Sequence, residues 1–219
     1  YTSLFNLPDH NYKFFYKDVI KDDLQQIFYD TDILIHLAAL TEATTSLDKP
    51  DEYERVNYLG TKKILELCKK NSIKIIHFSS TSIYGTNKSI VDESCGLEDI
   101  NPQSPYAATK YKEELLVREF FNNENLKTVT LRLGSICGTS PGMRFHAAIS
   151  KFCYQASTNQ PLTVWETALN QKRPFLNLND ATKAIAFIIE NDLFDGEVFN
   201  LVTSNFSVKE IIDIIKKYE

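Results

Sequence analysis

The sequence contains little glycine and almost no methionine. Its seven glycines are spread along 219 residues, and no three of them have the Gly-x-x-Gly-x-x-Gly spacing that places a pyrophosphate on a helix N-terminus. The chain begins at Tyr1, and Met143 is its single methionine. We therefore expect the sequence to be a piece of a longer protein.

Cysteine motifs, basic clusters and long apolar runs are also scarce. The four cysteines have no Cys-x-x-Cys spacing, so we expect neither a metal site nor a disulfide framework, and a cytoplasmic location. A formal net charge of -5 argues against nucleic-acid binding. The best apolar run, residues 33–40, is interrupted by His36 and is shorter than the ~18 residues that a membrane span needs.

The sequence instead alternates short apolar runs with longer amphipathic stretches. Continuous apolar runs flanked by turn residues are typical of a parallel sheet covered on both faces. We expect strands at residues 12–17, 32–37, 73–79, 128–133, 162–165 and 197–201. We expect helices at residues 50–68, 106–121, 145–156, 181–190 and 208–218. This order predicts an α/β fold with a doubly wound parallel sheet.

The pattern becomes less regular in the last third of the chain, which predicts two parts with a boundary near Gly138. Ser207 and Glu210 have the spacing of a capping box, which predicts the start of the last helix. The sheet-building part would comprise residues 1–138 with about 174–195, and a smaller irregular part would comprise about 139–173 and 196–219.

Polar residues that could carry chemistry follow the third expected strand. Ligands of an open parallel sheet bind beyond the carboxyl ends of its strands. Ser79 and Ser80 lie at such an end, and Tyr106 follows a Pro-x-x-Pro segment with Lys110 one helical turn later. Positions i and i+4 share a helix face, so the phenol and the ammonium can address one ligand. A neighbouring lysine cation lowers the pKa of a phenol from ~10, and a tyrosine thereby becomes a general base.

The bare spacing Tyr-x-x-x-Lys is a weak signal, because it occurs three times. Tyr58 lies inside the first long helix, and Tyr84 lies in a turn. Only Tyr106 opens a helix downstream of a serine-rich strand end, where a hydroxyl can bind the same oxygen that the tyrosine deprotonates. We therefore predict Tyr106 as the base and Lys110 as its activator.

With these motifs, the sequence resembles an extended short-chain dehydrogenase/reductase of the NAD-dependent epimerase/dehydratase family. The matching segments cover about residues 12–216 in the family's order. They are Asp18-Val19, Asp32-Ile-Leu-Ile-His-Leu-Ala-Ala39, Asn57-Tyr-Leu-Gly-Thr61, Ser79–Gly85, Ser104-Pro-Tyr-Ala-Ala-Thr-Lys110, Leu131-Arg132 and Arg173–Asp180. The resemblance implies a Rossmann-like sheet whose first βαβ element, with its glycine-rich turn, is missing from this sequence.

The resemblance also implies a role for each matching residue. Tyr106 would be the catalytic base, Lys110 its activator and a ligand of the nicotinamide ribose, and Ser80 the catalytic hydroxyl. The residues implied in cofactor binding are Asp18, Val19, Leu37, Ala38, Ala39, Asn57, Ser79, Tyr106 and Lys110. The residues implied in substrate binding are Ser80, Thr81, Tyr106, Ser135 and Arg173, the last as a bidentate clamp on a nucleotide diphosphate.

Among the family's reactions, the resemblance implies a nucleotide-sugar epimerase first. Tyr106 would remove a sugar hydroxyl proton while a hydride passes from the same carbon to NAD and then returns to the other face of the keto sugar. A 4,6-dehydratase would need an Asp-Glu pair after the catalytic hydroxyl, where the sequence has Thr81 and Ser82. A reductase, another oxidoreductase of the family and a non-catalytic nucleotide-binding relative stay open, as does NADP in place of NAD.

The resemblance further bears on partners. It implies a homodimer formed through the helices that contain Asn57 and Tyr106. The sheet-building part would bind NAD, and the irregular part would bind the nucleotide sugar. We expect no nucleic-acid or membrane partner.

Overall fold

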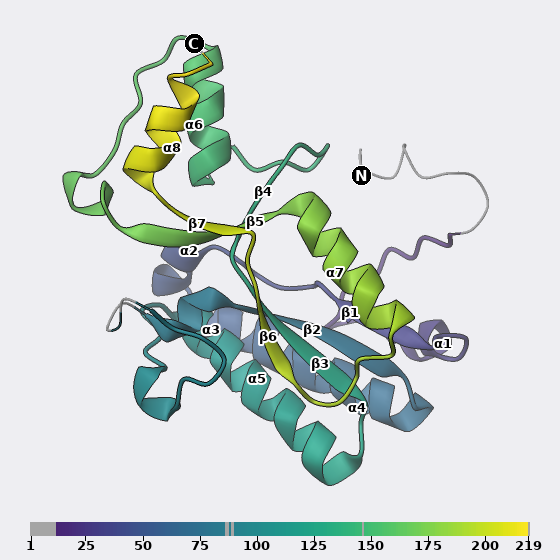
Figure 1. Cartoon of the computed structure of the whole chain (residues 1–219). Helices are drawn as coiled ribbons and strands as arrows, with labels where there is room; N and C mark the ends of the chain where they lie inside the picture. The colour runs from purple at the N-terminus through teal and green to yellow at the C-terminus, as the bar shows by residue number, and fades with distance from the viewer. Residues whose placement is uncertain (1–11, 86–87, 89, 146, 219) are drawn as a thin grey trace. The chain divides into compact units, whose positions relative to one another are not determined.

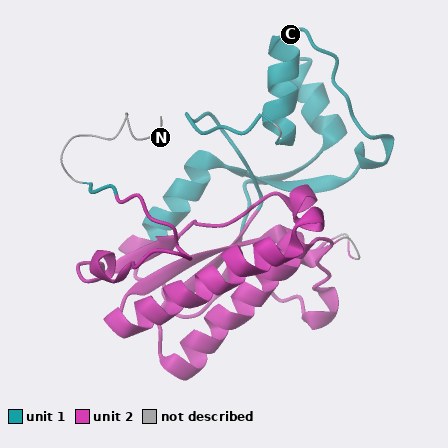
Figure 2. Cartoon of the chain, turned by 180° about the vertical axis from the view of Figure 1, so that it is seen from behind, with its two compact units in different colours: residues 1–14, 134–187, 201–219 teal, residues 15–133, 188–200 magenta. Residues whose placement is uncertain are grey.

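A computed structural model describes residues 12–85, 88, 90–145 and 147–218 of the chain. The chain divides into two compact units (Figure 2). The sheet unit comprises Phe15–Leu133 and Ile188–Asn200. The small unit comprises Tyr1–Phe14, Gly134–Phe187 and Leu201–Glu219. Within the described residues, no helix is both long enough and apolar enough to cross a membrane.

The sheet unit is built on a four-stranded sheet (Figure 1). Its strands are β1 (Ile33–His36), β2 (Lys74–Ser80), β3 (Thr128–Leu133) and β6 (Val198–Leu201), in the order β1-β2-β3-β6. The first three run parallel, and His36 pairs with His77 where β1 ends. These strands confirm the predictions at residues 32–37, 73–79, 128–133 and 197–201, and with them the α/β fold with a parallel sheet.

Helices connect the strands of this unit. The segment predicted to begin at Pro50 forms one continuous run: α3 (Pro50–Tyr53), a π-helical stretch (Glu54–Leu59) and α4 (Gly60–Asn71). Pro50 suits the first turn because its missing N–H would have no helical partner there. The other helices of the unit are α1 (Gln25–Phe28), α2 (Ala43–Asp48) and α5 (Pro105–Glu124).

The main core of the sheet unit lies between one face of the sheet and the pair α4 and α5. Ile75 from β2 packs there with Leu65 and Cys68 from α4 and with Leu116 and Val117 from α5. Side chains alternate along a strand, so His77 and Ser79 share this face with Ile75. The packed core therefore fixes the first turns of α5 against the carboxyl end of β2.

The small unit contains a three-stranded sheet of the order β4-β5-β7. Its strands are β4 (Ser135–Cys137), β5 (Lys172–Asn177) and β7 (Ser204–Ser207), and its helices include α6 (Ala148–Ser157) and α8 (Val208–Ile215). α7 (Leu178–Glu190) follows β5. Phe152, Phe175 and Ile211 form the core. The capping box is confirmed, since the Ser207 hydroxyl accepts from the Glu210 amide and the Glu210 carboxylate accepts from the Ser207 amide.

Two predicted strands are wrong. Residues 12–17 form no strand, and the aromatic side chains from Tyr12 to Tyr16 are half exposed or more. A strand needs a hydrogen-bonded neighbour, and none of the described strands pairs with this segment. Residues 162–165 also form no strand. Leu162 and Val164 do alternate inward onto the small unit's core, but the segment joins neither sheet.

Candidate active site

Tyr106 lies in the first turn of α5, where the local sequence fixes the start of the helix. The Ser104 side chain caps the helix by accepting from the Ala107 amide at 3.2 Å, and Pro105 occupies the first helical position. The Tyr106 amide donates to the Ser46 hydroxyl of α2 at 3.2 Å. Helix α2 was not predicted, and neither was this contact.

The ring of Tyr106 is half-buried and packs edge-on against another tyrosine. Its centroid lies 6.4 Å from that of Tyr53, at an interplanar angle of 80°. The Tyr53 hydroxyl donates to the Glu42 carbonyl at 2.7 Å, which anchors this second ring. The base predicted from the sequence therefore has a defined orientation at the start of α5.

Lys110 follows one turn later, and its side chain is 6% exposed. Its ammonium donates to Glu113 Oε2 at 2.9 Å. The same oxygen accepts from the Thr61 hydroxyl at 2.9 Å and lies 3.1 Å from His77 Nε2. Burial alone would raise the pKa of Glu113, but the hydrogen bond from His77 and the charge of Lys110 lower it to about 2. Lys110 thus has a buried carboxylate partner that the Tyr-x-x-x-Lys spacing did not reveal.

His36 extends this buried group of polar side chains to β1. Its Nε2 lies 3.0 Å from the Thr61 hydroxyl. Burial lowers the pKa of His36 to about 3, helped by the charges of His77 and Lys110, so the ring is neutral. The chain of contacts therefore runs from the carboxyl end of β1 through α4 and Glu113 to His77 in the middle of β2.

The serine-rich end of β2 presents three hydroxyls in different settings. Ser79 is buried, and its Oγ has no hydrogen-bond partner among the described residues. Ser80 Oγ accepts from the Ser82 amide at 3.2 Å and from its hydroxyl at 2.9 Å, which caps a 3-10 turn at Thr81–Tyr84. Thr81 donates to the Leu133 carbonyl at 3.1 Å. This turn packs against α5, so Ser80 and Tyr106 belong to contacting elements.

The loop after β1 is exposed to solvent, and the buried Asn57 side chain holds its backbone. Leu37 is 68% exposed, Ala38 is exposed and Ala39 is half-buried. Asn57 is fully buried, and its carboxamide accepts from the Leu40 amide at 2.8 Å and donates to the Leu40 carbonyl at 3.0 Å. Asn57 lies in the π-helical stretch, a feature frequent at functional sites. The short side chains of Ala38 and Ala39 leave room for a ligand beside a backbone that Asn57 fixes at Leu40.

Asp18 and Val19 lie in a turn that rests on the start of α4. The Asp18 carboxylate accepts from the amides of Ile20 and Lys21 at 2.8 and 3.1 Å, and these bonds lower its pKa. Val19 packs on the main core. A Cβ at Gly60 would lie 3.4 Å from Ile20 Cδ1 and 3.6 Å from the Val19 side chain, which shows how closely the turn lies against the start of α4. Asp18 therefore has a structural task in this turn.

The remaining predicted residues, Ser135 and Arg173, lie on neighbouring strands of the small unit. Ser135 begins β4 and pairs with Phe175 of β5. Arg173 lies in β5 opposite Phe206 and is exposed, and its guanidinium donates to the Gln171 side chain at 3.0 Å. Both side chains are accessible to a ligand of the small unit.

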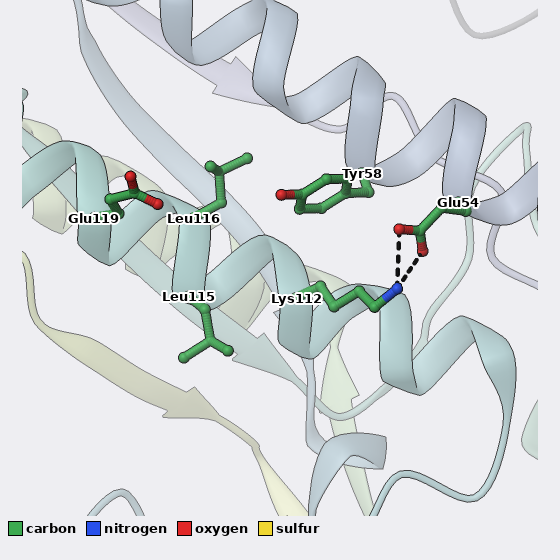
Figure 3. A pocket seen from close by; sticks show the side chains of 6 residues that line it. All are labelled: Glu54, Tyr58, Lys112, Leu115, Leu116 and Glu119. Carbon is green, nitrogen blue, oxygen red and sulfur yellow. Dashed lines mark hydrogen bonds and ion pairs between the residues drawn. The ribbon is translucent and has the colours of Figure 1, made fainter.

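A surface hollow of about 330 Å³ lies between the π-helical stretch and α5 (Figure 3). In Figure 3, Tyr58 lies between Leu116 and the ion pair of Lys112 with Glu54, whose atoms are 2.8 Å apart. Leu115 points away from this group and is 46% exposed. None of the residues predicted for catalysis lines the hollow, so it is separate from the candidate active site.

Comparison with known proteins decides the family. The model of the NAD dependent epimerase/dehydratase family matches residues 2–201. The chain belongs to this family. A dTDP-D-glucose 4,6-dehydratase of Dictyostelium discoideum is 29% identical over 96% of the chain and 50% of its own length. An uncharacterized UDP-glucose epimerase of Bacillus subtilis (strain 168) is 28% identical over 96% of the chain and 66% of its own length.

The fold is similar to that of a solved epimerase structure. A UDP-glucuronic acid 4-epimerase of Bacillus cereus, solved as a mutant with UDP-4-deoxy-4-fluoro-glucuronic acid and NAD, has 29% sequence identity and a TM-score of 0.83. The match covers 92% of the chain and 63% of that structure. The chain thus spans roughly half to two-thirds of the length of the proteins it resembles. The family and the fold predicted from the sequence motifs are confirmed.

Proposed function

We propose that this chain is the larger part of an NAD-dependent nucleotide-sugar epimerase. The observation that carries the proposal is the set Ser80, Tyr106 and Lys110, held by contacting elements at the carboxyl end of a parallel strand. Ligands bind at that edge in open α/β sheets. Family membership and the likeness to 4-epimerases support the same assignment.

In the proposed reaction Tyr106 takes a proton from a hydroxyl of the sugar. The ammonium of Lys110 stabilises the phenolate that Tyr106 needs, and the Ser80 hydroxyl binds the same sugar oxygen. The residues of the loop beyond β1 would hold NAD, which would supply an acceptor for the hydride of the sugar carbon and a donor for its return. The keto sugar must turn over between these two transfers, so its configuration is inverted and no cofactor is consumed.

Several residues fit the cofactor. Leu37, Ala38 and Ala39 lie in the open loop beyond β1, whose backbone Asn57 fixes, and the buried Ser79 hydroxyl is left without a protein partner among the described residues. Asp18 and Val19 would meet the adenine, the latter through its backbone. These residues fit the adenosine and nicotinamide ends, and the sequence has no glycine-rich turn for the pyrophosphate.

For the substrate, we propose contacts from Thr81, Ser135 and Arg173. Arg173 is exposed and bonded only to a neutral amide among the interactions described, so its fork is free to bind a diphosphate through two parallel bonds. Arg173→Lys should raise the KM for a UDP-sugar about tenfold with little change in kcat. An unchanged KM would contradict this role.

The central test is turnover of UDP-sugars by the full-length protein with NAD. We expect interconversion of sugar epimers without net change in NADH absorbance, and we expect Tyr106→Phe to abolish it while NAD binding, measured by calorimetry, is kept. Stoichiometric NADH consumption would indicate a reductase instead. Undiminished activity of Tyr106→Phe would refute the base assignment.

The dehydratase relative supports a second candidate reaction. At the two positions after Ser80 the structure has hydroxyls, and Thr81 donates to the Leu133 carbonyl while Ser82 donates to Ser80. Neither side chain can supply the acid and the base that elimination of water requires, so we favour epimerisation. Formation of a 4-keto-6-deoxy sugar in the same assay would reverse this preference.

We also propose a homodimer and a cytoplasmic location. Leu59 and Leu115 are exposed on the two helical segments that border the hollow of Figure 3, a surface that a second copy could cover. Light scattering should give the mass of two chains, and Leu115→Lys should give the mass of one. All four cysteines are free thiols, as expected in a reducing compartment.

A further inference from the structure

Glu113 is a fully buried carboxylate that the proposed reaction does not use. Its Oε2 receives three donors, from Thr61, His77 and Lys110, at 2.9 to 3.1 Å. Its Oε1 and the Nδ1 atom of His77 have no hydrogen-bond partner among the described residues. Burying a charge is unfavourable unless it is paired and hydrogen-bonded, so this uneven arrangement depends on the three donors.

The arrangement lies next to the candidate base. Glu113 is three residues after Lys110 on α5 and therefore shares its face of the helix. An ammonium bonded to a carboxylate acts on other groups as a nearly neutral pair, because the two fields oppose each other at a distance. The stabilisation that Lys110 gives to a phenolate at Tyr106 is thus reduced by Glu113.

Other charged groups on the elements packed against α5 are paired elsewhere or exposed. His36 is neutral and reaches Glu113 only through Thr61. The paired groups are Glu54 with Lys112, Glu52 with Lys49, Lys69 with Glu124, Lys70 with Gln25, Lys74 with Asp192, Arg132 with Glu114 and Tyr84, and Lys63 with the carbonyls of Ile20 and Asp22. The exposed ones are Asp48, Asp51, Arg55, Lys62 and Glu66. Glu113 is therefore the carboxylate that acts on Lys110 at short range.

We propose that Glu113 is a positioning residue for Lys110, which holds the ammonium in place and sets the pH range in which Tyr106 removes a proton. The proposal rests on the proposed function for its catalytic consequence. Its structural half, that Glu113 holds Lys110, stands on the three contacts alone. One measurement tests the effect of Glu113 on catalysis, and a second tests its contact with Lys110.

The first measurement is the pH profile of kcat. Glu113→Gln keeps the shape of the side chain and removes its charge, so the acid limb should move to lower pH by about one unit. At the optimum, kcat should fall about tenfold because Lys110 is no longer held, while KM stays within about twofold. The matched control is Glu190→Gln, an exposed carboxylate at the end of α7, which should leave the profile unchanged.

Glu113→Asp keeps the charge and tests whether charge is the cause. Its acid limb should stay with that of the wild-type protein even where kcat falls. A limb unmoved in Glu113→Gln, or moved equally in Glu113→Asp, would overturn the proposal. If the variants change only the melting temperature, and the acid limbs of their kcat profiles coincide with that of the wild-type protein, Glu113 serves stability only. That result would also overturn the proposal.

The second measurement needs no activity. Lysines are acetylated in competition and read by mass spectrometry, with exposed Lys62 as the internal reference. We expect Lys110 to be protected in the wild-type protein and labelled about tenfold faster in Glu113→Gln. If that variant does not fold, Glu113→Asp should also speed the labelling, because its carboxylate is drawn back by one carbon.

Equal labelling of Lys110 in the wild-type protein and a folded variant would overturn the structural half. Absence of turnover in the wild-type protein, together with faster labelling in the variant, would refute the proposed function and leave Glu113 as the partner of Lys110. The two failures are therefore distinguishable.

Discussion

Glu113 and Glu114 are neighbouring buried carboxylates on α5, and their oxygens are hydrogen-bonded in different ways. Glu114 binds the guanidinium of Arg132 through both oxygens, with Nε at 3.0 Å from Oε1 and Nη2 at 2.8 Å from Oε2. Glu113 collects all three of its described donors on one oxygen. The planar guanidinium of an arginine holds a carboxylate rigidly through two bonds, whereas the ammonium of a lysine lies at the end of a flexible side chain and can move.

The two arrangements predict different tasks for the two pairs. Arg132 also donates to the Tyr84 hydroxyl at 2.6 Å, so β3, α5 and the turn after β2 are joined by one residue. Burial opposes the charge of Arg132, but its bonds to Glu114 and Tyr84 raise its pKa above the usual value. Lys110 and Glu113 instead lie beside the candidate base. The comparison predicts unequal responses to mutation.

The largest expected effect is that of Arg132→Met. The substitution leaves the Glu114 carboxylate buried without its partner, and we expect a loss of about 3–5 kcal/mol in the free energy of unfolding. Urea denaturation followed by circular dichroism measures this loss. A smaller loss of unfolding free energy than in Lys110→Met would show that the Arg132–Glu114 pair does not stabilise the fold more than the Lys110–Glu113 pair.

Lys110→Met should have a smaller effect on stability and a complete effect on turnover. Glu113 keeps Thr61 and His77 as donors, so we expect a loss of about 1–3 kcal/mol in the same denaturation experiment. Epimerisation should disappear because the phenolate of Tyr106 loses its cation. Retained turnover in a folded Lys110→Met protein would contradict the assigned role.

The dependence of stability on pH tests the buried charge of Glu113. The pKa of Glu113 falls from 4.5 to about 2 on folding, so its contribution is complete above pH 4.5 and is lost as the pH falls toward 2. The wild-type protein should therefore lose roughly 3 kcal/mol more than Glu113→Gln between these limits. Parallel curves of unfolding free energy against pH for the two proteins would disprove this linkage.

The smallest expected effect concerns the exposed ion pair of Lys112 and Glu54. Both side chains are substantially exposed, so Lys112→Met should change the free energy of unfolding by less than about 1 kcal/mol. The same denaturation series at low and high salt measures it. A loss as large as that of Lys110→Met would mean that exposure does not separate these pairs.

Much of the fold could be predicted from the sequence, for a physical reason. The strands at 74–80 and 128–133 are buried along nearly their whole length, and the strand at 33–36 begins with three consecutive apolar residues, so each contains the apolar residues typical of a strand in a covered sheet. The capping box at Ser207 is a local pattern and was equally visible. The segments at 12–17 and 162–165 have strand-like composition, but pairing depends on distant partners that composition does not reveal.

The site was predictable only where the motif is local. Tyr106 and Lys110 lie one turn apart, and Ser80 ends a strand, so their spacing indicated their place. Glu113 is one of several charged residues in α5, and nothing in its spacing shows that it faces the sheet. Its burial depends on His77 and Thr61, which are 36 and 52 residues away along the chain. The roles of all these residues stay predictions until the variants are measured.

The π-helical stretch Glu54–Leu59 has a consequence for how this chain tolerates change in length. A wider turn accommodates one surplus residue within a helix, so the residues before it are rotated relative to those after it by about 100°, one α-helical step. Deleting a single residue there would restore ordinary pitch, swing the carboxamide of Asn57 away from Leu40 and release the strand-end loop. An alanine substitution elsewhere in the same turn would leave that rotation intact.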